Sequence, residues 1–78
     1  MNETVFKDLQ TIIADVLNCN AEEIKPETSF VNDLGADSLD VYQIIMSVEE
    51  KYNISISPEA AEGIRTVGDA NEAIQKAL

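Results

Sequence analysis

The chain contains no histidine and a single cysteine, Cys19, among its 78 residues. A catalytic serine or cysteine usually depends on histidine as its base, so this absence argues against a hydrolase of that kind. One cysteine cannot form a disulfide within the chain, which suits a reducing compartment. No histidine or basic residue stands beside Cys19 in the sequence, so we expect a packing residue near a helix end and not a reactive thiol.

Positive charge is also scarce, because five Lys and Arg residues stand against fifteen Asp and Glu residues, for a formal net charge of −10. Binding to a phosphate backbone requires a basic surface, so no nucleic-acid partner is expected. The excess of carboxylates favours partners with basic docking patches, although it would also suit a surface that is merely well hydrated.

Long apolar runs are absent as well. The first seven residues lack the basic segment and apolar stretch of a signal peptide, and no stretch is long enough to cross a membrane. We therefore expect a cytoplasmic monomer without membrane insertion. A chain of 78 residues allows one small core, so residues 1–78 are predicted to form a single domain of modest stability.

The many carboxylates do not form a recognisable metal or catalytic motif. Asp33, Asp37 and Asp40 lack the spacing of a calcium-binding EF-hand loop, and no glycine or terminal glutamate completes one. We expect no dedicated metal site, only weak adventitious binding of divalent cations. We do not expect Asp37 and Asp40 to act as an acid–base pair, because the chain is too short for an obvious substrate cleft.

Apolar residues recur at helical spacing over three long segments. The pattern predicts a helix over residues 3–17, a second over 38–52, and a last one from an approximate capping box at Thr66 to about residue 77. No alternating stretch is long enough to build a sheet. The predicted fold is all-α, a small antiparallel bundle of three principal helices plus one short helix, with a long loop before the second long helix.

Shorter signals fill the connections between these helices. Asn20 is expected to cap a single turn, and Ser57 followed by Pro58 predicts a short helix that ends near Gly63. Pro26 opens the long loop, whose apolar residues are expected to pin it to the core: Phe30, Val31 and Leu34.

The second long helix has two apolar faces. At about 100° per residue, one face has the width of an ordinary buried stripe and consists of Val41, Ile44, Ile45, Val48 and Tyr52. A second stripe lies roughly 140° away and consists of Leu39, Tyr42 and Met46. The long loop or the short helix could cover it. We favour a docking surface, because solvated carboxylates of Glu49 and Glu50, with Gln43 and more distantly Asp40, flank it as a basic-rimmed partner groove would require.

Ser38 stands where the long loop becomes this helix. Asp37 and Ser38 are both good N-cap residues, and Gly35 supplies backbone freedom just before them. A hydroxyl there lies near unpaired backbone N–H groups and the positive end of the helix dipole, a favourable place for a phosphate ester. The alternative is that Ser38 only caps the helix.

The segment Leu34-Gly35-Ala36-Asp37-Ser38-Leu39-Asp40 closely resembles the phosphopantetheine attachment site of the acyl carrier proteins. The likeness continues through residues 44–52, Ile54, Ile56, Ala61-Glu62 and residues 64–70, and covers essentially the whole chain. It implies that Ser38, flanked by Asp37 and Leu39, carries a 4′-phosphopantetheine arm installed from coenzyme A by a phosphopantetheinyl transferase. The protein would then have no catalysis of its own.

By the same resemblance, acyl groups are held on the arm as thioesters and presented to acyl-transfer, ketosynthase and reductase enzymes with basic docking patches. The leading setting is dissociated bacterial-type fatty acid synthesis. The candidate docking residues are Leu39, Asp40, Tyr42, Gln43, Met46, Glu49, Glu50, Ile56 and Glu62.

Three departures from the family pattern concern partner choice. Gln43 replaces a usual glutamate, Tyr42 a usual aliphatic residue, and Ile56-Ser57-Pro58 stands where Ile-Pro-Asp is common. A dedicated carrier for polyketide, aminoacyl or other specialised groups therefore stays open. Asp37 and the acidic charge count against an aminoacyl carrier. The alternative of another class is an unmodified acidic protein-interaction module.

The charge gives a first testable prediction. Carboxylates crowded on a small domain repel one another, so raising the salt concentration from about 0.01 M to about 0.15 M should raise the melting temperature. Millimolar divalent cations should have the same effect. A melting temperature that stays level or falls with salt would contradict this expectation.

Overall fold

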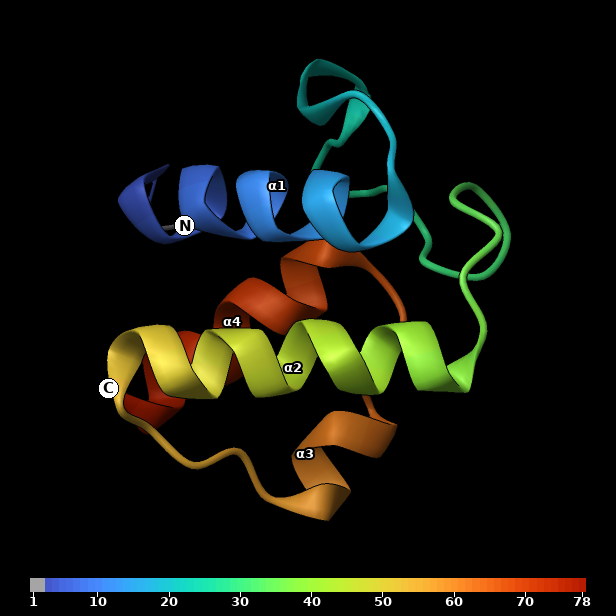
Figure 1. Cartoon of the computed structure of the whole chain (residues 1–78). Helices are drawn as coiled ribbons and strands as arrows, with labels where there is room; N and C mark the ends of the chain where they lie inside the picture. Colours follow the sequence, from blue (N-terminus) through green and yellow to red (C-terminus); the bar gives the residue numbers. More distant parts are fainter. Residues whose placement is uncertain (1–2) are drawn as a thin grey trace.

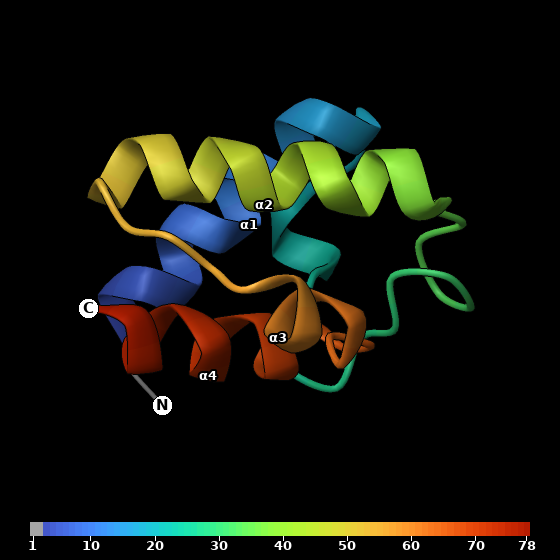
Figure 2. The same ribbon diagram turned by 90° about the horizontal axis from the view of Figure 1, so that it is seen from below.

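The computed structural model describes residues 3–78 and contains the predicted helices. They are α1 (Glu3–Leu17), a 3-10 turn η1 (Ala21–Glu23), α2 (Ser38–Tyr52), α3 (Pro58–Glu62) and α4 (Val67–Ala77). Figures 1 and 2 show α1 running in the opposite direction to α2 and α4, with the short α3 beside α2 and α4. The all-α bundle predicted from the sequence is confirmed.

Local side-chain signals set the helix ends. Asp37 caps α2, and its side chain accepts from the backbone N–H of Asp40 at 2.9 Å. Thr66 caps α4 in a second capping box, completed by Asp69. Ser57 caps α3, with Pro58 as its first residue. These three helices thus begin where their sequence signals lie, because each cap satisfies a backbone N–H group that has no partner inside the helix.

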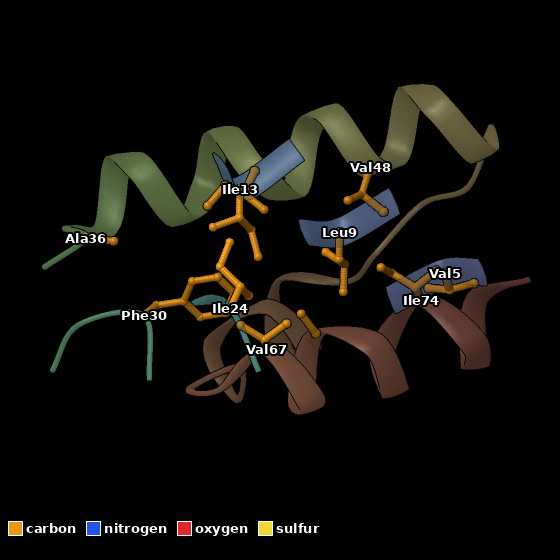
Figure 3. Packing of buried hydrophobic residues seen from close by; sticks show 11 residues of the cluster. Val5, Leu9, Ile13, Ile24, Phe30, Ala36, Val48, Val67 and Ile74 are labelled. Carbon is orange, nitrogen blue, oxygen red and sulfur yellow. The ribbon is translucent and has the colours of Figure 1, made fainter. Parts of the chain in front are cut away.

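The core lies between α1, α2, α4 and the long loop, as Figure 3 shows in part. Cys19, half-buried, packs against this core, as expected of a packing residue. The buried apolar residues are Val5, Leu9, Ile13, Ile24, Phe30, Ala36, Ile44, Ile45, Val48, Val67, Ala70 and Ile74.

The predicted core face of α2 is fully buried only at its centre. Ile44, Ile45 and Val48 are buried, whereas Val41 and Tyr52 are half-buried. The Tyr52 hydroxyl donates a hydrogen bond to the Asp8 carboxylate on α1. Burial and this acidic partner raise the pKa of Tyr52 to about 12. The end of α2 is therefore fixed to α1 by a polar contact as well as by packing.

Backbone hydrogen bonds join the long loop to the segment before α4 and to the first turn of that helix. The Phe30 N–H donates to the carbonyl of Arg65 at 3.1 Å, and the Gly68 N–H donates to the carbonyl of Pro26 at 2.8 Å. A Cβ at Gly68 would lie 3.0 Å from that Pro26 oxygen, so a larger residue there would press on the loop backbone. Of the residues expected to pin the loop, Phe30 is buried and Leu34 is half-buried, but the prediction for Val31 was wrong because this side chain is 64% exposed.

The capping box of α4 predicts a pH effect. The Asp69 carboxylate accepts the backbone N–H groups of Thr66 and Arg65, each at 3.2 Å, and these bonds lower its pKa. The ionised carboxylate therefore stabilises the fold above about pH 4, the ordinary aspartate pKa, and this contribution is lost as the pH falls through the lower folded-state pKa. Asp69→Asn should lower the urea midpoint at pH 7, and the gap to wild type should shrink towards pH 2.5.

The matched control for this experiment is Glu72→Gln, an exposed carboxylate on the same helix. It should not show a gap that depends on pH in this way. A gap for Asp69→Asn that is the same at both pH values would contradict the role assigned to the Asp69 charge.

Candidate functional site

The chain just before α2 is anchored to the core. Ala36 is buried, and its backbone N–H donates to the carbonyl of Phe30 at 2.8 Å. The preceding Gly35 has a positive φ of 66°, a conformation that glycine adopts without strain. Figure 3 shows Ala36 and Phe30 on the loop side of the core. The anchor fixes the point from which α2 starts.

Ser38 is the first residue of α2 and is exposed. The sequence left open whether Asp37 or Ser38 caps the helix, and the structure assigns the cap to Asp37. Within residues 3–78, the Ser38 hydroxyl forms no hydrogen bond with another residue. Its side chain is therefore available for chemistry, and the first-turn backbone N–H groups beside it suit a phosphate.

An open hollow of about 620 Å³ lies beside Ser38, between α2, α3 and the long loop. Its walls are mostly apolar, and they also include the exposed residues Asp37 and Glu62. The hollow is lined by Val31, Ala36, Asp37, Ser38, Val41, Tyr42, Ile45, Ala61, Glu62 and Ile64. These residues fit a phosphopantetheine arm, because a phosphate would lie at the helix start and the flexible remainder could follow the apolar wall.

The second apolar stripe of α2 is open to solvent. Leu39 is 77% exposed, Tyr42 60% and Met46 49%, so neither the long loop nor α3 covers them. Gln43 and Glu50 are also exposed on α2, and Glu62 is exposed on α3. An uncovered apolar stripe flanked by acidic residues is typical of a protein interaction site.

Three candidate docking residues take part in the fold. Asp40 is half-buried and completes the α2 capping box by accepting the Asp37 N–H at 3.3 Å. Glu49 is half-buried, and not fully solvated as the sequence predicted, because its carboxylate accepts the Ile56 N–H at 2.8 Å. The side chain of Ile56 is half-buried and lines the interior of the bundle.

No signal in the sequence indicated that Val31 lines the hollow. Alternation of buried and exposed residues is not expected in a loop, so no pattern separates Val31 from the buried Phe30 beside it. Within residues 3–78, no group of three Cys, Asp or Glu side chains is placed to hold a metal ion. In the same part of the chain, every helix is too short or too polar to span a bilayer.

Comparison with known proteins agrees with this geometry. A family model described as "Phosphopantetheine attachment site" matches residues 7–74. An acyl carrier protein of Wolinella succinogenes is 54% identical over 83% of this chain and 86% of its own length, and one of Helicobacter pylori is 52% identical over 91% of both. A solved structure from Mycobacterium tuberculosis, assigned to the acyl carrier proteins, is 30% identical with a TM-score of 0.87 over 92% of this chain and 96% of its own.

The fold and the family match together define a helical carrier domain that holds 4′-phosphopantetheine covalently. The chain belongs to the acyl carrier proteins. As a member of this family it has no catalysis of its own and works with a phosphopantetheinyl transferase and acyl-handling enzymes.

Substitutions on the two faces of α2 are predicted to lower stability by different amounts. Ile45 is 6% exposed and Met46 49%, so Ile45→Ala should lower the free energy of unfolding by roughly 2–5 kcal/mol, whereas Met46→Ala should cost far less. Urea unfolding of both variants checks this. Equal losses for the two substitutions would show that the Met46 side chain is part of the core.

Proposed function

We propose that Ser38 is the attachment point of the phosphopantetheine arm. The observation that carries the proposal is the exposed Ser38, whose hydroxyl has no hydrogen-bond partner among residues 3–78 because Asp37 caps α2. In the transferase complex, the Ser38 oxygen would displace adenosine 3′,5′-bisphosphate from coenzyme A and pass its proton to the transferase. The new phosphodiester would place its negative charge at the positive end of the α2 dipole.

The docking surface of this carrier is proposed to be the exposed stripe of α2 and its acidic surroundings. Leu39, Tyr42 and Met46 would enter an apolar groove of the partner. Glu50 on α2 and Glu62 on α3 would face its basic rim. The formal net charge of −10 would draw such partners from a distance.

The interior of the bundle is the proposed shelter for a bound acyl chain. Leu9, Phe30, Ile44, Ile56 and other apolar side chains surround a cavity of about 10 Å³. This volume holds about one water molecule, so an acyl chain would enter only if the walls moved apart.

We further propose that the chain is a cytoplasmic, monomeric, single-domain carrier that works in dissociated bacterial-type fatty acid synthesis. The support is its likeness to bacterial acyl carrier proteins at 52–54% identity. A dedicated carrier of another acyl group is the second candidate, because Tyr42 and Gln43, both exposed on α2, replace residues usual in the family. Loading assays with acyl-transfer enzymes of each pathway would distinguish the two.

Ser38→Ala should abolish modification and leave the domain folded. The hydroxyl is not the cap of α2, so its removal should cost less than the ~1 kcal/mol of a typical cap. Wild type and variant are incubated with coenzyme A and a broad-specificity phosphopantetheinyl transferase, and their intact masses and circular dichroism spectra are compared. Wild type should gain one phosphopantetheine mass and the variant none, with similar spectra.

Ser55→Ala is the matched control, because Ser55 is exposed and caps no helix. This control should be modified like wild type. A mass gain in Ser38→Ala would move the attachment point to another residue. A wild type that gains no mass would favour the unmodified interaction module.

A further inference from the structure

One hydrogen bond joins the docking face of α2 to the segment that leads into α3. The Glu49 carboxylate accepts the backbone N–H of Ile56 at 2.8 Å, across a separation of seven residues. The backbone carbonyl of Glu49 also accepts the N–H groups of Asn53 and Ile54 at the end of α2. Of the hydrogen bonds that Glu49 accepts from residues after α2, the one at its carboxylate therefore lies furthest along the connection to α3.

The segment held in this way closes one side of the apolar interior. The side chains of Ile56 and Ile64, on either side of α3, both line the interior cavity. In Figure 2 the connection from α2 to α3 runs between α2 and α4. The segment from Ile56 to Ile64, which includes α3, therefore covers the space in which an acyl chain is proposed to lie, and we call it the α3 lid.

Ile54, Ile56 and Ile64 on either side of α3 pack against the core but are only partly buried, and α3 itself adds little to this packing. The helix has five residues, none of them buried, and Ser57 to Ala60 are exposed. Segments with little buried apolar surface open at a low free-energy cost. A hydrogen bond to a charged acceptor is a large share of the stability of such a segment.

We propose that Glu49 is a latch that keeps the α3 lid closed and that releases it when a cationic group of a partner pairs with the carboxylate. Glu49 lies on the same helix as the exposed Tyr42 and Met46, three residues beyond Met46 in sequence, so a lysine or arginine that docks on this face comes within reach of it. A paired cation competes with the Ile56 N–H for the Glu49 carboxylate and so weakens the hydrogen bond that holds Ile56. The partner-driven step rests on the proposed docking function, whereas the latch itself does not.

The latch is tested on the unmodified protein by amide hydrogen exchange, followed by NMR. Exchange at Ile56 should be about tenfold faster in Glu49→Ala than in wild type, the effect expected for losing one charged hydrogen bond. Glu49→Gln should lie between them, because its amide oxygen can still accept the bond without the charge. Glu50→Ala removes an exposed neighbouring carboxylate and should leave the rate unchanged.

The Phe30 amide, bonded to the Arg65 carbonyl, is the internal reference for global opening. It should keep its wild-type rate in Glu49→Ala. The latch would be overturned if the Ile56 exchange rate were unchanged in Glu49→Ala. It would also be overturned if exchange at Phe30 were accelerated as much as exchange at Ile56 in both Glu49 variants.

The release step is tested with hexalysine as the cationic probe. It should accelerate exchange at Ile56 about twofold or more in wild type and in Glu50→Ala, and should have no such effect in Glu49→Ala. No acceleration in wild type, or equal acceleration in Glu49→Ala, would overturn release by cations. These measurements need no attached arm, so their outcome is separate from that of the modification of Ser38.

Discussion

The hydrogen bond from the Ala36 N–H to the Phe30 carbonyl is the constraint on which the functional end of this molecule depends. Both residues are buried, and the bond of 2.8 Å turns the long loop back on itself directly before α2. Phe30 is bonded in turn to the carbonyl of Arg65, ahead of α4. A loop that would otherwise be mobile is thereby fixed to the core at the point where α2 begins.

This anchoring separates two tasks that one serine could have combined. The Asp37 side chain accepts a backbone N–H of the first turn of α2, so the Ser38 hydroxyl is not needed as a cap and stays exposed. A phosphate ester on Ser38 would then meet the helix start without breaking a cap. The same helix buries Ile44 and Val48 on one face and leaves an apolar stripe uncovered on the other, which lets a small core and a docking surface share one element.

The sequence predicted what depends on local signals and on periodicity. The helix ends follow from caps such as Ser57 and Thr66, and the exposed stripe follows from helical geometry. The pairing of the long loop with the segment before α4 could not be predicted, because backbone hydrogen bonds leave no mark in the residue pattern. The bond of Glu49 to Ile56 was missed for a related reason: it depends on the path of the chain after α2 ends.

The most direct test of the account is to map the attachment point on wild-type protein with every serine in place. After modification from coenzyme A, peptides are sequenced by tandem mass spectrometry and searched for the phosphopantetheine mass at each serine. The account predicts the whole modification on Ser38, the one serine at the start of α2. Modification at Ser29, Ser47, Ser55 or Ser57, or at none of the serines, would contradict it.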